Sequence, residues 1–191
     1  WKPQGRNKLK IIWAPHHTID VPELPYANFL QYADLFQALV TTHEDAIQWC
    51  FKPHPILKAK LAKHPDWGPE KTDAYYDFWQ SHPSAQMELG GYTTLFRTSD
   101  AMIHDSGSFV AEYLYVDKPV MFLWSKPAVR EFFNDYGKAA LQGSERGDTA
   151  ADITGFVDKL IAGVDDGVAK RSAFRDAYPF LQDDKTPSEA I

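Results

Sequence analysis

Three clusters of polar side chains each follow a short apolar run, and their residue types suit phosphate chemistry. The clusters are His16-His17-Thr18, His54, and Asp105-Ser106-Gly107-Ser108. Hydroxyl and imidazole groups donate hydrogen bonds, and a neutral imidazole can also accept a proton as a base. Backbone N–H groups at the start of a helix favour a bound phosphate. Together, the clusters predict a site for a diphosphate group.

The elements that must position these clusters are three buried strands. Apolar runs at 9–14, 47–51 and 101–103 are typical of strands in a parallel sheet, and each ends close to a cluster. In an open α/β sheet, ligands bind outside the carboxyl ends of the strands. If the three strands are parallel, we therefore expect the clusters to share one edge of the sheet.

Two of the clusters also have a purely structural interpretation. Ser106 or Ser108 would serve as an ordinary N-cap for a helix beginning at Phe109, and this is the simpler explanation of that turn alone. His54 stands between two prolines, so by itself it would be a rigid turn residue. Only the combination of clusters favours a ligand site.

A zinc site is the other alternative for His16 and His17. A third ligand would have to come from His54, His104 or Asp105. The compact ligand spacing of zinc enzymes, such as HExxH, does not occur in the sequence. We therefore predict a phosphate site and no metal.

The remaining patterns predict a single α/β domain over residues 1–191. Further strands are predicted at 86–89 and 120–124. Helices are predicted at 28–42, 57–62, 69–79, 92–97, 109–116, 129–136, 153–164 and 169–178. The glycine-containing segment 137–149 is expected to be a loop, and 182–191 a frayed polar tail. Strands that alternate with helices indicate a mainly parallel, Rossmann-like sheet flanked by helices.

Composition excludes several classes of function. The 191 residues are 44% hydrophobic, enough for a sizeable core, and the net charge of −6 argues against nucleic-acid binding. Cys50 is the single cysteine, so no disulfide framework exists and a reducing compartment is expected. No apolar run approaches the ~20 residues that span a bilayer. Because the chain begins at Trp1 rather than methionine, we expect it to be a piece of a longer protein.

Internal repeats are not evident in the sequence. His-Pro pairs recur at 54, 64 and 82, but their flanking residues share no pattern. We therefore treat the pairs as unrelated.

A series of motifs resembles a known enzyme family. The motifs are Ile12-Trp13-Ala14-Pro15, Phe51-Lys52-Pro53-His54-Pro55, Ser99-Asp100-Ala101-Met102-Ile103-His104-Asp105-Ser106-Gly107-Ser108, Glu112, and Asp117-Lys118-Pro119-Val120. In type and order they resemble the signatures of CDP-glycerol glycerophosphotransferases, which build teichoic-acid-type polymers. The resemblance spans roughly residues 9–124. It implies the C-terminal, nucleotide-binding half of a GT-B fold, with a separate N-terminal domain that brings the acceptor to the cleft.

The chain departs from that family at two places. The family has threonine, an aromatic residue and arginine after the first Ala-Pro, where this chain has His16-His17-Thr18. The family's Asp-aromatic-Ser-Ser turn is replaced by Asp105-Ser106-Gly107-Ser108. The Asp-Ser-Gly sequence is also similar to that of UDP-N-acetylglucosamine 2-epimerases, which form another GT-B family. The nucleotide and the transferred group therefore stay open.

The first resemblance implies a transferase that needs no cofactor. It would move glycerophosphate from CDP-glycerol to the hydroxyl of a polymer or lipid-linked acceptor during cell-surface polymer synthesis. The expected location is the cytoplasm, with the inner face of the cell membrane as an alternative. Two alternatives remain. One is a UDP-sugar GT-B enzyme, such as a 2-epimerase or a sugar transferase, and the other is a nucleotide-binding module that has lost catalysis.

The resemblance also implies roles for the clustered residues. Ser106, Gly107 and Ser108 would hold the diphosphate, and His54 would donate to a phosphate oxygen and stabilise the charge that develops on it. His16 or His17 would orient the phosphate or act as base, and a histidine of the separate N-terminal domain is an equal candidate for the base.

Three further residues complete the expected donor-binding set. Glu112 would bind the ribose hydroxyls, although a carboxylate in the first turns of a helix also stabilises the helix without any ligand. Asp105 and Thr18 are assigned to the same set because they belong to the two clusters.

Overall fold

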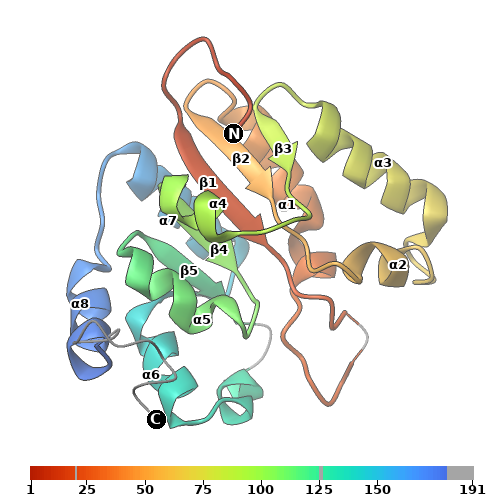
Figure 1. Ribbon diagram of the computed structural model, residues 1–191. Helices are drawn as coiled ribbons and strands as arrows, with labels where there is room; N and C mark the ends of the chain where they lie inside the picture. Colours follow the sequence, from red (N-terminus) through yellow and green to blue (C-terminus); the bar gives the residue numbers. More distant parts are fainter. Residues whose placement is uncertain (20, 125–126, 180–191) are drawn as a thin grey trace.

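The computed structural model describes residues 1–19, 21–124 and 127–179. Within this part, six strands form one sheet in the order β3-β2-β1-β4-β5-β6 (Figure 1), and every neighbouring pair is parallel. The strands are β1 (Leu9–Ala14), β2 (Ile47–Phe51), β3 (Ala85–Met87), β4 (Ala101–His104), β5 (Val120–Leu123) and β6 (Glu145–Gly147). The predicted α/β fold with a parallel sheet is confirmed.

The strand order reverses between β1 and β4. From β1 the chain builds outward to β2 and β3, then crosses back to lay β4 on the other side of β1. Ala14, the last residue of β1, is level with His104, the last residue of β4. The two strands therefore end side by side at the point where their connections diverge, which is where open α/β sheets bind ligands.

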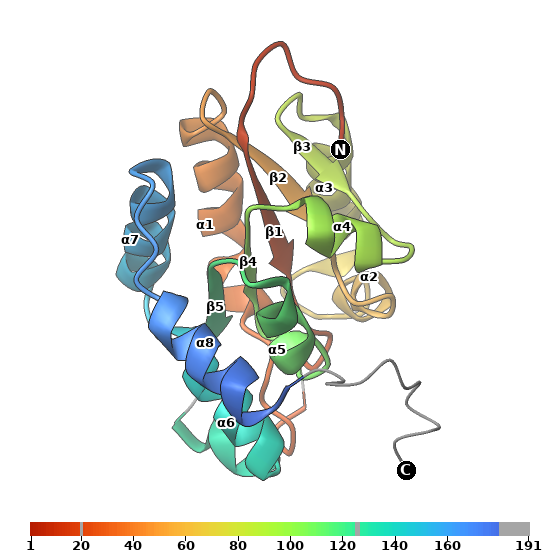
Figure 2. The same cartoon turned by 60° about the vertical axis from the view of Figure 1, so that its left-hand side comes forward.

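Helices cover both faces of the sheet. They are α1 (Phe29–Thr42), α2 (Leu57–Leu61), α3 (Gly68–Ser81), α4 (Thr93–Thr98), α5 (Phe109–Glu112), α6 (Asp135–Gly143), α7 (Ala150–Ile161) and α8 (Val168–Ala177), with 3₁₀ turns η1 (Tyr113–Val116) and η2 (Pro127–Phe132). Helices α1 and α7 lie on one side, and α4 and α5 on the other (Figure 2).

The central strands are apolar on both faces because both faces are covered. The two cores meet different sides of the same strands, so that Trp13 belongs to one core and Ile12 to the other. The Trp13 ring is fully buried and stacks on Phe36 at 4.0 Å and on Phe29 at 5.5 Å. This packing fixes β1 against α1 and so sets where the loop after β1 begins.

The prediction of a loop over 137–149 is wrong. That segment contains most of α6 and all of β6. Asn134 caps α6 by accepting a hydrogen bond from the Gly137 N–H at 2.9 Å. Strand β6 is a three-residue edge strand that opens with Glu145 and Arg146, so it lacks the apolar run by which a buried strand is recognised.

Two predicted helices differ in kind. The helix expected over 109–116 is α-helical for four residues in α5 and continues as the 3₁₀ turn η1. The segment predicted as a helix over 129–136 is the 3₁₀ turn η2 as far as Phe132 and the start of α6 from Asp135. The predicted polar tail, 182–191, lies outside the described residues.

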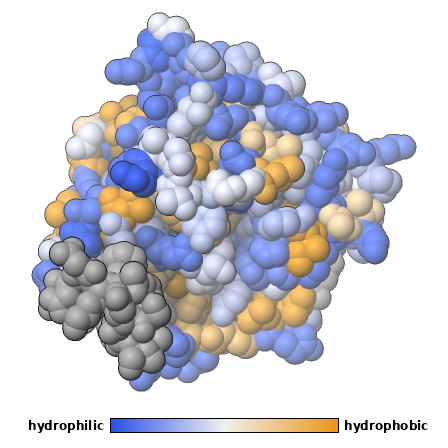
Figure 3. Space-filling view, viewed as in Figure 1, coloured by the Kyte–Doolittle hydropathy of each residue, from blue (hydrophilic) through white to orange (hydrophobic). Residues whose placement is uncertain are grey.

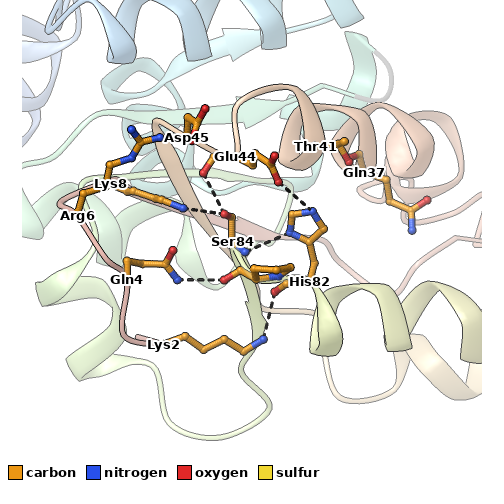
Figure 4. Close-up of polar contacts among 11 residues, drawn as sticks. Lys2, Gln4, Arg6, Lys8, Gln37, Thr41, Glu44, Asp45, His82 and Ser84 are labelled. Carbon is orange, nitrogen blue, oxygen red and sulfur yellow. Dashed lines mark hydrogen bonds and ion pairs between the residues drawn. The ribbon is translucent and has the colours of Figure 1, made fainter.

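An N-terminal segment runs along the amino edge of the sheet. Lys2 Nζ donates to the Gln80 carbonyl oxygen at 2.6 Å, near the C-terminus of α3. It also donates to the His82 carbonyl oxygen at 3.3 Å (Figure 4). The Trp1 indole donates to Thr98 Oγ1 at 3.0 Å. These contacts tie residues 1–8 to the edge that lies opposite the polar clusters.

The surface also differs between the amino edge of the sheet and the opposite edge. In Figure 3 the upper rim, where the N-terminal segment runs, is mostly hydrophilic, and hydrophobic patches lie in the middle and along the lower rim. Ile56 and Leu89, which follow β2 and β3, are 46% and 58% exposed. Among the described residues, no helix has the length and apolar character needed to cross a bilayer.

Two glycines give a matched test of this packing. A Cβ on Gly147 would lie 2.7 Å from Met121 Sδ and 2.9 Å from Leu123 Cδ2, so Gly147→Ala should cost about 1–3 kcal/mol of stability. A Cβ on Gly155, inside α7, would meet nothing within 4 Å, so Gly155→Ala should stabilise by about 0.5–1 kcal/mol. Urea unfolding curves of both variants check the prediction, and equal effects at the two positions would contradict it.

Candidate functional site

The loops after β1 and β2 stay paired beyond the ends of the strands. The Lys52 N–H donates to the Trp13 carbonyl at 2.8 Å, and the His54 N–H donates to the Pro15 carbonyl at 3.2 Å. As a result the rings of three histidines pack together. Ring centroids are 4.3 Å apart for His16 and His17, 4.1 Å for His17 and His54, and 5.5 Å for His16 and His54.

A cavity of about 310 Å³ opens beside this histidine cluster. Its walls come from the ends of four strands, with the β4 turn facing the β2 loop. The lining residues are Ala14, Pro15, Lys52, Pro53, His54, Pro55, Leu89, Gly90, Tyr92, Ser106, Ser108 and Phe109. The cavity therefore occupies the edge where the order of the strands reverses, and it combines His54 with two of the predicted phosphate-binding serines.

All three clustered histidines favour the neutral form. Burial lowers the pKa of His16 to about 4, with a further contribution from His17 and His54. Burial also lowers the pKa values of His17 and His54, and repulsion from the Lys60 ammonium adds to the effect. Near neutral pH the cluster is thus a set of uncharged donors and acceptors.

The tautomer of His54 follows from its own backbone. Its Nδ1 accepts a hydrogen bond from the Ile56 N–H at 3.3 Å, so in the neutral ring the proton is on Nε2. His54 can therefore donate a hydrogen bond from Nε2, but its basic nitrogen is already occupied. The base role expected in this cluster is left to His16 or His17.

The three His-Pro pairs have the same local geometry. In His64 and His82, as in His54, Nδ1 accepts the N–H of the residue two positions on, at 3.2 Å in both cases. Figure 4 shows the His82 turn, in which the Ser84 N–H points at the ring. The pairs are therefore related as turns despite their different flanking sequences. Of the three histidines, His54 lines the cavity described above.

Asp105 lies beneath the site and organises it. Its carboxylate accepts the His16 N–H at 2.5 Å, the Asn28 N–H at 2.6 Å and the Asn28 amide at 3.2 Å. The residue is 1% exposed, and burial raises the pKa of its carboxyl to about 6 in spite of these hydrogen bonds. The structure thus uses Asp105 to hold the loop after β1 and the start of α1, and Asp105 is not among the residues that line the cavity.

The Ser106–Ser108 turn borders the cavity without capping a helix. Ser108 makes no side-chain cap hydrogen bond, so the expected N-cap is absent there, and α5 has a single turn of four residues. Ser106 is 7% exposed and Ser108 is exposed. A Cβ on Gly107 would meet Tyr26 at an ordinary contact of 3.5 Å, so packing against Tyr26 does not by itself require glycine.

The last two predicted site residues, Thr18 and Glu112, do not line the cavity. The Thr18 hydroxyl is 3.0 Å from His16 Nδ1, so it positions that ring. Glu112 borders a second groove of about 410 Å³ between α4 and η1. Tyr92 lines both the groove and the cavity, and the Glu112 carboxylate raises the pKa of its hydroxyl.

A buried histidine at the end of β4 is unusual. His104 is fully buried, neither ring nitrogen has a hydrogen-bond partner among the described residues, and the Phe122 ring stands edge-on at 5.2 Å. Burial lowers its pKa to about 3. In the described part of the chain, no group of three or more His, Cys, Asp or Glu side chains is arranged to hold a metal ion.

Sequence reasoning missed two residues of the site. Asn28 links Asp105 to the end of β5 by donating to the Leu123 carbonyl at 3.2 Å, and Lys52 lines the cavity from the end of β2. A lysine directly after a largely apolar strand is a signal that could have identified Lys52. Asn28 carries no such signal because asparagine is an ordinary residue before a helix.

This architecture resembles that of solved structures. No protein-family profile and no curated sequence matches the chain. Solved structures do match, and one is UDP-GlcNAc 2-epimerase from Methanocaldococcus jannaschii, with a TM-score of 0.54 and 12% identity over 90% of this chain and 46% of that one. The fold is of the GT-B type. The S. aureus MnaA–UDP structure matches with a TM-score of 0.53 and 16% identity over 86% and 39% of the two chains.

The same epimerase in complex with UDP-GlcNAc and UDP matches with a TM-score of 0.50 and 14% identity, over 89% of this chain and 45% of that one. This chain therefore spans less than half of the solved structures that it resembles. The GT-B-type fold that the resemblance implied is confirmed. The resemblance to CDP-glycerol glycerophosphotransferases has no support from a matching sequence family.

Proposed function

We propose that this chain is the donor-binding half of a GT-B-type enzyme that acts on a UDP-sugar or a related nucleotide-diphosphate sugar. The observation that carries the proposal is the cavity at the point where β1 and β4 diverge. Its place on a GT-B-type sheet supports a nucleotide ligand, because structural neighbours were solved with UDP and with UDP-GlcNAc. The proposal adopts the epimerase or sugar-transferase alternative rather than CDP-glycerol transfer.

The residues around the cavity suit a diphosphate. The hydroxyls of Ser106 and Ser108 can donate to phosphate oxygens, and His54 can donate from Nε2 while remaining uncharged. A neutral donor that strengthens as charge develops stabilises a transition state more than the ground state. His16 and His17, which are neutral by burial, retain a nitrogen that can accept a proton.

A CDP-linked alcohol remains a second candidate donor. The ordered motifs at 12–15, 51–55 and 99–108 favour it. It shares the diphosphate with a UDP-sugar and differs in the base and in the group beyond the second phosphate. The chemistry of the cavity that we invoke, namely hydroxyls and imidazoles, is the same for both donors.

Calorimetric titration of the 191-residue chain with UDP, UDP-GlcNAc, CDP, CDP-glycerol and uridine tests the proposal. We expect UDP and UDP-GlcNAc to bind, and to bind more tightly than uridine. Preference for CDP and CDP-glycerol would favour the second candidate. Binding without turnover in an intact two-domain protein would indicate a module that has lost catalysis, and no binding of any nucleotide would refute the proposal.

His54→Ala should weaken UDP binding about tenfold, because one hydrogen bond to a charged phosphate is lost. In an enzyme that contains this half, turnover should fall about a hundredfold or more, as for other preorganised donors. His82→Ala is the matched control, since it removes the same kind of turn at the amino edge of the sheet. Equal affinity for UDP in the two variants would show that His54 only stabilises its turn and does not bind the ligand.

A further inference from the structure

Lys52 is a buried cation in the wall of the cavity. It directly follows β2, the residue is 6% exposed, and it is the one lysine or arginine among the described residues that line the cavity. Burying an ammonium group is costly unless hydrogen bonds and charges compensate. Burial accordingly lowers the pKa of Lys52, and the Glu88 carboxylate partly opposes this effect.

The ammonium group has more donors than the protein uses. Nζ donates one hydrogen bond, to the Gly90 carbonyl at 2.9 Å. An ammonium has three N–H donors, and among the described residues Nζ has no second hydrogen-bond acceptor and no carboxylate within 4.0 Å. Two N–H donors of the ammonium are therefore left for another acceptor.

The lining of the cavity indicates what would complete this charge. His54 is neutral by burial, and the serine hydroxyls carry no charge. Lys52 is therefore the charged group by which this cavity can bind a phosphorylated ligand more tightly than an uncharged one. Bonds from an ammonium to phosphate oxygens are charge-assisted and roughly twice as strong as neutral ones.

We propose that Lys52 recognises the anionic diphosphate of the donor and so sets the preference of the cavity for a nucleoside diphosphate over a nucleoside. This inference rests on the proposed function and names a determinant of specificity that the motifs did not assign. It makes Lys52 a binding residue as well as an anchor for Gly90.

The test compares two ligands that differ in the diphosphate alone. The ratio of UDP to uridine affinity is measured by calorimetry for the 191-residue chain, for Lys52→Met and for Lys52→Arg. If Lys52 only anchors Gly90, Lys52→Met weakens both ligands alike and the ratio stays constant. If Lys52 recognises the diphosphate, the ratio should fall about tenfold to a hundredfold in Lys52→Met and be largely retained in Lys52→Arg.

Lys58→Met is the matched control. Lys58 lies in α2, has a side chain that is 50% exposed and pairs with Asp73 at 2.8 Å, so its loss should leave the ratio unchanged. A wild-type chain that binds neither UDP nor any other nucleotide would refute the proposed function and this inference together. A wild-type chain that binds UDP, with an unchanged ratio in Lys52→Met, would overturn this inference alone.

A second measurement does not depend on the folding of Lys52→Met. In the wild-type chain labelled with ¹⁵N at lysine Nζ, UDP should shift the Lys52 signal and uridine should leave it in place. The spectrum of Lys52→Arg assigns that signal. If the chemical shift of the Lys52 signal does not change at saturating UDP, the inference is overturned.

Discussion

Asp105→Ala should destabilise the chain by about 2–4 kcal/mol and abolish nucleotide binding with it. The carboxylate accepts the backbone N–H groups of His16 and Asn28 in a fully buried position. Without it, buried donors lose their acceptor, and each unsatisfied group costs about 1–3 kcal/mol. Burial raises the pKa of the Asp105 carboxyl to about 6, which shows that burying the charge is costly. Asp105→Ala removes that cost, and this offsets part of the loss of stability.

Binding is affected because the same hydrogen bonds place the histidine cluster. Asp105 lies between the β4 turn and the loop that carries His16, so losing it should free that loop. Chemical unfolding and UDP calorimetry on one preparation measure both effects. Asp105→Asn keeps one acceptor oxygen and should lose less stability than Asp105→Ala. An Asp105→Ala chain that is as stable as wild type and binds UDP normally would contradict the assigned role.

The free energy of unfolding should fall by about 3 kcal/mol as the pH is lowered from about 6.5 to 4. The pKa values of His16 and His104 are about 4 and 3 in the folded chain, against 6.5 for a histidine exposed to water in the unfolded chain. Between these values the unfolded chain binds more protons, so acid favours unfolding. Asp105 acts in the opposite direction, because its raised pKa of about 6 lets the folded chain bind a proton first.

His104→Leu separates the contribution of the buried ring. It removes two unpartnered nitrogens from an apolar site and should raise stability at pH 7 by about 1–2 kcal/mol. It should also flatten the dependence of stability on pH below about 6.5. Urea unfolding at several pH values gives both quantities, and a slope equal to that of wild type would show that His104 does not carry the acid sensitivity.

The sheet was predictable where burial leaves an apolar signature. The runs at 9–14, 47–51 and 120–124 form β1, β2 and β5 almost as expected, because central parallel strands are buried on both faces. The edge strand β6 was not predicted, because only one of its three residues is buried and the other two are charged. Its pairing to β5, from Met121 with Glu145 to Leu123 with Gly147, is a tertiary property that a local pattern does not contain.

The candidate site was predictable as a location more than as a set of contacts. The rule that parallel strands end at one edge correctly placed His16, His54 and Ser106 together. It could not show that Asp105 faces backbone N–H groups, nor that Glu112 borders a different groove. Those outcomes depend on side-chain direction after the strand ends, where the chain has no periodicity to follow.

The shared geometry of the three His-Pro turns has a consequence for how such a site can arise. In each turn the ring already satisfies a backbone N–H of its own loop, so the histidine is useful to the fold before any ligand is present. Its orientation is fixed at no further entropic cost, and its outer nitrogen carries a proton. A protein that already contains this turn can thus acquire a hydrogen-bond donor for a bound phosphate by enlarging a neighbouring cavity, without any change to the histidine itself.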